Sequence, residues 1–97
     1  MPTYVSLLTW TDEGIRNYRD TLQRADSFRD MVAQAGGKVR ELLWTMGELD
    51  LITVIEAPDD ATVTRVMLQL SSLGNERTRS MPGFTADEMT DIISRTS

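Results

Sequence analysis

The run Leu51-Ile52-Thr53-Val54-Ile55 constrains the fold more than any other part of the sequence. An uninterrupted run of β-branched and aliphatic residues, bounded by a turn and by Pro58, is typical of a strand buried on both faces. The segment Val39 to Thr45 also carries adjacent apolar residues, in Leu42-Leu43-Trp44. Gly47, in the connector between the two segments, can take the positive φ that a short turn needs. The stretch therefore predicts an antiparallel hairpin at the centre of the chain.

The half before the hairpin predicts a strand followed by a helix. Tyr4 to Leu8, with Thr9 and Trp10 following, form the first strand. Thr11-Asp12-Glu13 supplies an N-cap and two acidic groups for a helix start. One apolar stripe marks the helix: Ile15, Tyr18, Leu22, Ala25, Phe28, Val32 and Ala35. Asp20-Thr21 can interrupt this helix, and Gly36-Gly37 ends it.

The half after the hairpin repeats the pattern. A second helix starts after Pro58-Asp59-Asp60 and ends at Gly74. Its apolar stripe is Val63, Val66, Met67, Leu70 and Leu73. Asn75 to Met81 alternates like a strand but is almost wholly polar, as an edge strand is when it must discourage foreign pairing. Thr85-Ala86-Asp87-Glu88 is a capping box that opens a short terminal helix, whose Met89, Ile92 and Ile93 can dock.

The predicted order of elements is strand, helix, strand, strand, helix, strand. This is the α+β, ferredoxin-like βαββαβ arrangement, with two right-handed crossovers that place both helices on one face of a four-stranded antiparallel sheet. The strands then stand in the spatial order 4-1-3-2. We expect residues 1–97 to form a single domain, with the short terminal helix appended.

Two helices can cover only one face of such a sheet, yet the first three strands bring apolar side chains to both faces. An uncovered apolar surface of this kind marks an interaction site. The sequence therefore predicts a homo-oligomer, a dimer or a higher symmetric assembly of dimers, in which a second copy packs sheet to sheet.

Composition excludes several classes of function. The chain has no cysteine and no histidine, so it lacks thiolate nucleophiles, imidazole bases and the usual zinc or haem ligands. Its net charge of −5, without a basic run, argues against nucleic acid as a partner. We expect no cofactor and no metal. No apolar run approaches the length of a membrane span, and the N-terminus lacks a signal pattern, so we expect a cytoplasmic location.

Segments along nearly the whole chain resemble the GYD-domain proteins. They are Met1-Pro2-Thr3-Tyr4-Val5-Ser6-Leu7, Thr11-Asp12-Glu13-Gly14-Ile15, Arg24-Ala25, Ala35-Gly36-Gly37, Trp44-Thr45-Met46-Gly47, Asp50, Glu56-Ala57-Pro58-Asp59 and Gly74-Asn75-Glu76-Arg77-Thr78. The chain departs from the family at Leu49, where the tyrosine of the family name is expected. The resemblance implies a domain of the dimeric α+β barrel type and carries no established activity. Proteins with that barrel include cofactor-independent monooxygenases, haem-degrading enzymes and ligand-binding regulators.

We expect the first and third strands to run parallel, so that Thr9-Trp10 and Glu56-Ala57-Pro58-Asp59 lie at one end of the sheet. The fourth strand would start at that end and add Asn75 and Arg77. A carboxylate, an arginine, an amide and a hydroxyl would then converge on a polar ligand. Alternatively, Glu56 and Arg77 form a structural ion pair while Asp59 caps the second helix.

Three more residues, Asp50, Arg79 and Trp44, are candidates for a ligand site, and Arg77 has a second possible role. Asp50 can act as a general base if desolvated, or accept hydrogen bonds from the turn. Arg77 and Arg79 share one face of the fourth strand, where they would bind an anion or protect the edge. Trp44 can line a pocket or pack in a core or interface.

These observations predict a self-associating domain that binds a small polar or anionic molecule in the cavity between paired sheets. The alternative is a small enzyme of the cofactor-independent monooxygenase type. Without histidine, its proton transfer would fall to Asp50, Glu56, Tyr4 or Tyr18, inside a deep apolar pocket. No catalytic constellation in the sequence identifies a reaction.

Overall fold

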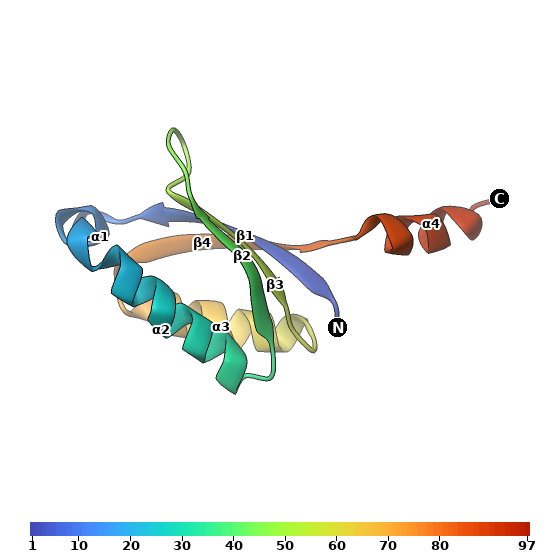
Figure 1. Ribbon diagram of the computed structural model, residues 1–97, viewed down its shortest axis with the longest axis horizontal. Helices are drawn as coiled ribbons and strands as arrows, with labels where there is room; N and C mark the ends of the chain where they lie inside the picture. Colours follow the sequence, from blue (N-terminus) through green and yellow to red (C-terminus); the bar gives the residue numbers. More distant parts are fainter.

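A computed structural model describes residues 1–97 and has the predicted α+β architecture. In chain order its elements are β1 (Thr3–Trp10), α1 (Asp12–Arg16), the 3-10 turn η1 (Tyr18–Asp20), α2 (Thr21–Gln34), β2 (Lys38–Trp44), β3 (Leu51–Glu56), α3 (Asp60–Ser72), β4 (Glu76–Gly83) and α4 (Ala86–Ser94). Helices α2 and α3 lie on one side of the sheet, and α4 stands clear of the domain (Figure 1).

The four strands form one antiparallel sheet in the order β2-β3-β1-β4. This is the predicted order read from the other edge, and it confirms the ferredoxin-like fold. The expectation that the first and third strands run parallel is wrong, because β1 pairs with β3 antiparallel, with Leu8 opposite Leu51 and Thr3 opposite Glu56. A β-strand that returns directly from the central hairpin reverses direction, so β3 opposes both β2 and β1.

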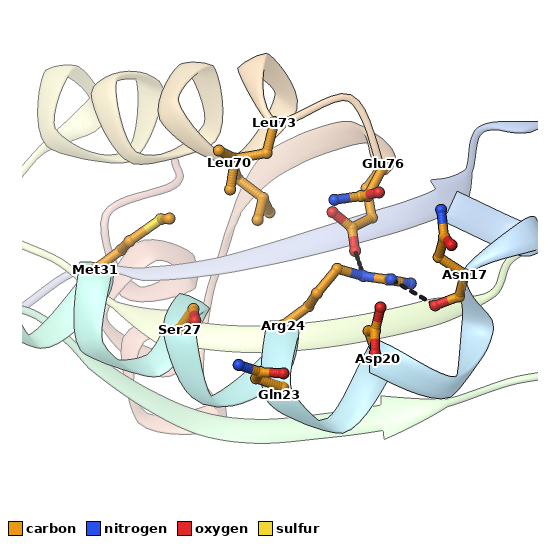
Figure 2. A pocket seen from close by; sticks show the side chains of 10 residues that line it. Asn17, Asp20, Gln23, Arg24, Ser27, Met31, Leu70, Leu73 and Glu76 are labelled. Atoms are coloured by element: carbon orange, nitrogen blue, oxygen red, sulfur yellow. Dashed lines mark hydrogen bonds and ion pairs between the residues drawn. The ribbon is translucent and has the colours of Figure 1, made fainter. Parts of the chain in front are cut away.

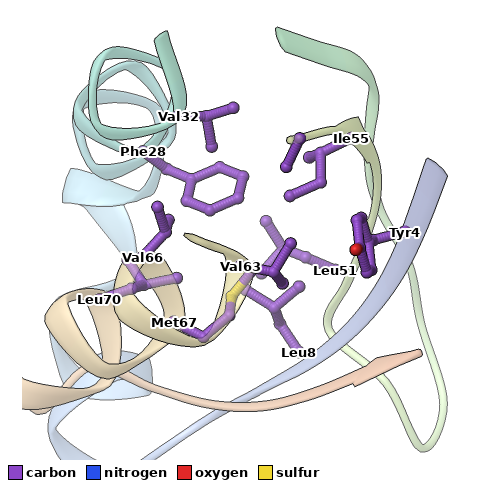
Figure 3. Packing of buried hydrophobic residues seen from close by; sticks show 11 residues of the cluster. Tyr4, Leu8, Phe28, Val32, Leu51, Ile55, Val63, Val66, Met67 and Leu70 are labelled. Atoms are coloured by element: carbon purple, nitrogen blue, oxygen red, sulfur yellow. The ribbon is translucent and has the colours of Figure 1, made fainter. Parts of the chain in front are cut away.

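The core fills the space between the two helices and the inner face of the sheet (Figure 3). Phe28 and Val32 of α2 meet Ile55 of β3, which is completely buried. The remaining members of the core cluster are Tyr4, Leu8, Leu51, Ala57, Val63, Val66, Met67 and Leu70. Positions 63, 66, 67 and 70 recur at helical spacing, which explains why α3 buries one face.

The predicted first helix is broken into α1, η1 and α2, close to the expected interruption at Asp20-Thr21. Thr11 caps α1 by accepting a hydrogen bond from the Gly14 backbone N–H at 3.1 Å. Because the break rotates α1 relative to α2, the apolar stripe does not continue across it. Ile15, Tyr18 and Leu22 are exposed, contrary to the single stripe that their spacing predicts.

Two glycines permit close backbone contacts that fix the ends of the helices. A Cβ at Gly14 would collide with the carbonyl oxygen of Asn75, and a Cβ at Gly37 would collide with that of Glu56. Gly14 therefore lets α1 approach the start of β4, where the Thr11 backbone N–H donates to the Asn75 carbonyl at 3.0 Å. The hairpin turn behaves as predicted, since Gly47 has a φ of 101°.

The outer face of the sheet is not covered by a helix, and its central part is apolar. We call it the open face. Its register places two apolar rows side by side: Met81, Val5 and Val54 in one row, and Leu7, Ile52 and Leu43 in the other. Leu43 and Met81 are exposed, and the other four side chains are half-buried.

The terminal helix α4 has the predicted capping box. Thr85 accepts from the Glu88 backbone N–H, and the Glu88 side chain accepts from the Thr85 backbone N–H. The expectation that α4 docks on its own domain is wrong for this chain, because α4 contains no buried residue. It extends from the end of β4 as an arm (Figure 1). None of the helices combines the length and the apolarity needed to span a bilayer.

Candidate functional site

A hollow at one end of the open face brings together two of the predicted site residues, Arg77 and Arg79. The hollow has a volume of about 650 Å³. Its wall consists of Leu7, Thr9, Glu48, Leu49, Arg77, Thr78 and Arg79. Arg77 is opposite Thr9 and Arg79 is opposite Leu7, so both arginines belong to the open face, as predicted. Because alternate residues of a strand lie about 7 Å apart, the two guanidinium groups can reach one anion.

The other predicted residues at this end serve the framework. The Asp50 carboxylate accepts a hydrogen bond from the Trp10 backbone N–H at 2.7 Å, which ties the hairpin to β1. The predicted donors were amides of the turn, and this part of the prediction is wrong because the donor belongs to β1. The Trp10 side chain packs against the core on the inner face, and its indole N–H has no hydrogen-bond partner.

Glu56, Trp44 and Asn75 do not join the hollow. Glu56 lies at the opposite end of the sheet, because β3 runs antiparallel to β1, and it accepts from the Arg40 guanidinium at 2.9 Å. The predicted Glu56–Arg77 ion pair is therefore wrong. Trp44 is exposed rather than packed in the core, and its indole N–H donates to the Thr21 hydroxyl at 2.9 Å. Asn75 holds α1 through its backbone carbonyl.

The predicted cap of the second helix is confirmed. Asp59 accepts from the Thr62 backbone N–H at 2.8 Å and from the Thr62 hydroxyl at 2.7 Å. These hydrogen bonds lower the pKa of the Asp59 carboxyl. Its carboxylate is therefore occupied in starting α3, and no group of three or more acidic side chains gathers as a metal site.

The residues named for proton transfer are engaged or exposed. Tyr4 donates from its hydroxyl to the Asp60 carboxylate at 2.6 Å, and this hydrogen bond raises the pKa of Tyr4 to about 12. A phenol with that pKa stays protonated at neutral pH. Tyr18 lies exposed on η1, and Asp50 and Glu56 have the partners described above.

Sequence reasoning missed a buried ion pair between α2 and β4. Arg24 and Glu76 lie in a cleft between α2 and α3, with the Arg24 Nε 3.4 Å from the Glu76 Oε1 (Figure 2). The Arg24 guanidinium also donates to the carbonyl of Asn17 at 2.8 Å and to that of Gly14 at 3.3 Å. One side chain therefore joins α2, α1 and β4.

The surroundings of Glu76 act on its charged form in opposite directions. The exposed fraction of its side chain is 6%, and its Oε2 has no hydrogen-bond partner. Burial raises the pKa of the Glu76 carboxyl, and the neighbouring Arg24 opposes that shift. The alternation of β4 contained the signal for this site, because Glu76 belongs to the inner face, opposite Trp10.

Comparison with known proteins identifies relatives of this chain. A protein-family model described as the GYD domain matches residues 4–93. The glutamine synthetase and cystathionine beta-lyase binding protein of Thermus thermophilus is 32% identical over 96 residues, which cover 98% of each chain. The crystal structure of the Thermus thermophilus protein TTHA0845 has a TM-score of 0.56 and 22% sequence identity, covering 89% of this chain and 96% of that chain. That structural likeness supports the fold alone.

We expect Arg24→Met to lower the free energy of unfolding by about 3–5 kcal/mol, because Glu76 would be left buried without its cation. The double variant Arg24→Met/Glu76→Gln should recover part of this loss. Urea denaturation followed by circular dichroism measures both values. Equal stability of the two variants would contradict a buried, coupled pair.

The Arg24–Glu76 pair should also make the free energy of unfolding depend on pH. A raised pKa means that the folded state binds more protons than the unfolded state, so stability falls as pH rises from the ordinary value of 4.5 through the folded-state pKa of Glu76. Glu76→Gln should remove this fall. A wild-type slope that persists in the variant would assign it to another group.

Proposed function

The chain belongs to the GYD domain family, and we propose that it is a non-catalytic domain that associates with a second copy through its open face and binds a small anionic ligand at the arginine-bearing end of that face. The observation that carries the proposal is the pair of apolar rows across the open face. Apolar side chains that remain in water destabilise the free chain relative to an assembly that buries them.

A second copy is the simplest partner for this surface. A two-fold axis brings the same patch of both chains together, so one sequence satisfies both sides of the interface. Paired sheets pack about 10 Å apart, and aliphatic side chains from the two faces interdigitate at that distance. Val54, at the centre of β3 and opposite Val5, would lie in the middle of the contact.

The hollow supplies the ligand site at the rim of this contact. Its two arginines, with the hydroxyl of Thr9 on the same face, provide donors for a carboxylate or phosphate group. Position 49, where the family resemblance leads us to expect tyrosine, lies in the wall of the hollow and holds an apolar Leu49. A second sheet packed over the open face would close the hollow and strengthen these charged contacts by excluding water.

The monooxygenase alternative fits this geometry less well. Its chemistry relies on a deep apolar pocket that contains a free carboxylate or phenol. The hollow is instead open and mostly polar, and the candidate groups Asp50, Glu56 and Tyr4 already have hydrogen-bond partners.

The relative from Thermus thermophilus supports a second candidate function, the binding of a metabolic enzyme. That protein is named for binding glutamine synthetase and cystathionine beta-lyase, and its alignment covers 98% of this chain. We infer that this chain can bind an enzyme of the same kind. An enzyme that used the open face would compete with the second copy, whereas one that used the helical face would bind the dimer.

We expect Val54→Glu to convert the assembly to a monomer at micromolar concentration, because the interface would have to bury an unpaired carboxylate at a cost of several kcal/mol, roughly a 100-fold or greater loss of affinity. Analytical ultracentrifugation measures the change. The control is Leu22→Glu, which places the same charge on an exposed residue of α2. A wild-type chain that stays monomeric would defeat the proposal.

We expect inorganic phosphate to bind the wild-type protein and to lose at least about tenfold in affinity in the Arg77→Ala/Arg79→Ala variant, because each charge-assisted hydrogen bond contributes about 1.5–3 kcal/mol. Isothermal titration calorimetry at low salt measures this. Arg16→Ala/Arg29→Ala, which also removes two arginines, both exposed, is the matched control. Equal losses in both variants would indicate non-specific charge attraction.

For the second candidate, we expect purified glutamine synthetase or cystathionine beta-lyase from the organism that encodes this chain to bind it in a surface plasmon resonance assay. The Val54→Glu variant then distinguishes the surfaces, since it should weaken binding only through the open face. Absence of binding to both enzymes at tens of micromolar, roughly −6 kcal/mol, would exclude this function.

A further inference from the structure

The terminal arm α4 is an amphipathic helix without a surface to cover. Met89, Ile92 and Ile93 fall on one side of it and are all exposed. Its side-chain hydrogen bonds are confined to the helix, its cap and the following residues. A helix of 9 residues is shorter than the roughly 12–15 at which isolated helices become stable in water. The apolar side of α4 therefore needs a docking surface.

A groove of matching length runs between α3 and β4 on the helical side of the sheet. Two adjoining hollows of about 350 Å³ and about 210 Å³ share Val63, Thr64 and Ser80, so they form one continuous groove. We call it the α3/β4 groove. Its floor is apolar, with Val63 and Met67 buried and Leu68 exposed along its edge. From Val63 to Ser71 it follows as many helical residues as α4 contains.

We propose that α4 of one copy docks in the α3/β4 groove of a second copy, antiparallel to α3. This inference rests on the proposed self-association and adds a second contact to it. An apolar helix face laid in an apolar groove is a common mode of recognition. Here the same chain provides both the helix and the groove.

Charge selects the antiparallel direction. The first turn of α4 carries Asp87 and Glu88, and Arg95 follows its last turn. The groove has Arg77 at the end near Ser71 and Asp60 at the other end. Antiparallel docking places the acidic turn beside Arg77 and Arg95 beside Asp60. It also places the positive end of each helix dipole beside the negative end of the other.

The same charges disfavour docking of α4 in the groove of its own chain. β4 ends beside Tyr4, which hydrogen-bonds Asp60, so the chain's own α4 would enter the groove at the Asp60 end. It would then run parallel to α3, with Asp87 and Glu88 next to Asp60. A helix from a second copy is free to enter from the Arg77 end.

The interface area also calls for the arm. Four strands about 4.8 Å apart, with roughly six residues each at about 3.3 Å, give an open face of roughly 400 Å². Stable interfaces bury about 800 Å² per partner. The open face alone therefore provides about half of that area, and exchanged arms supply more. Arg77 lines both the groove and the anion-binding hollow, so docking and anion binding are coupled through this side chain.

Cysteine cross-linking tests the contact, because the natural chain has no cysteine. Ile93→Cys is mixed with Thr64→Cys in one sample and with Ser71→Cys in another, under oxidised glutathione. Each chain carries one thiol, so a disulfide between the two variants joins two chains. We expect the Thr64→Cys mixture to form covalent heterodimer at least about tenfold faster, since antiparallel docking brings only that pair within disulfide distance.

Faster cross-linking through Ser71→Cys, or none in either mixture, would overturn the proposal. The double variant Thr64→Cys/Ile93→Cys provides a second test. A covalent dimer would support docking of α4 on the second copy, and a monomer closed by an internal disulfide would overturn it. Circular dichroism checks that each variant is folded, which we expect because the altered side chains lie outside the core.

Sedimentation of the wild-type protein, at the concentration used for cross-linking, separates this inference from the proposed function. A wild-type dimer, combined with cysteine variants that form no disulfide, retains sheet pairing and excludes arm docking. A wild-type monomer excludes both.

Discussion

A layer of two helices cannot cover both faces of a four-stranded sheet whose central strands are apolar on both sides. In this chain α2 and α3 bury the inner side chains, including Ile55 and Leu8, in the core. Val54 and Leu7, which alternate with them along the same strands, point to the open face. The alternation of a β-strand forces this outcome, because a residue cannot be moved to the covered face without shifting the register of its whole strand. The sequence of β1 and β3 therefore leaves an apolar surface uncovered, and this surface is the basis of the proposed association.

The polar contacts hold the framework around that surface. The Arg24 guanidinium joins α2 to the carbonyls of α1 and to the buried Glu76 of β4. At the same end of the sheet, Asp50 fastens the hairpin to β1 through the Trp10 backbone. The two arginines of the hollow both lie on β4, which the Arg24–Glu76 contact joins to α2. A framework of this kind would orient the donors for the proposed anion and reduce the entropy lost on binding.

The sequence predicted the fold well because its signals were local. The run Leu51–Ile55, the glycines that end the helices and the capping box at Thr85 each specify an element from neighbouring residues. The arrangement of the site was predicted less well because it depends on strand direction. Assigning β3 the wrong direction placed Glu56 beside Arg77, whereas these residues lie at opposite ends of the sheet.

Other differences arose where a local pattern needed a tertiary partner. The spacing of Ile15, Tyr18 and Leu22 matched a continuous stripe, but Ile15 and Tyr18 precede the break before α2, and Leu22 in the first turn of α2 is also exposed. The apolar side of α4 led us to expect docking, but α4 buries no residue on its own domain. The Arg24–Glu76 pair was not predicted because the two charged residues are distant in sequence, and no local pattern indicates that they are buried together.

Native mass spectrometry of the unmodified protein over a range of micromolar concentrations tests the central claim most directly, because it counts chains without altering either surface. The account predicts ions at an even multiple of the 10.9 kDa chain mass, with the dimer as the smallest abundant species. Ions of a single chain at every concentration would show that the open face does not require a second copy, and would contradict the account.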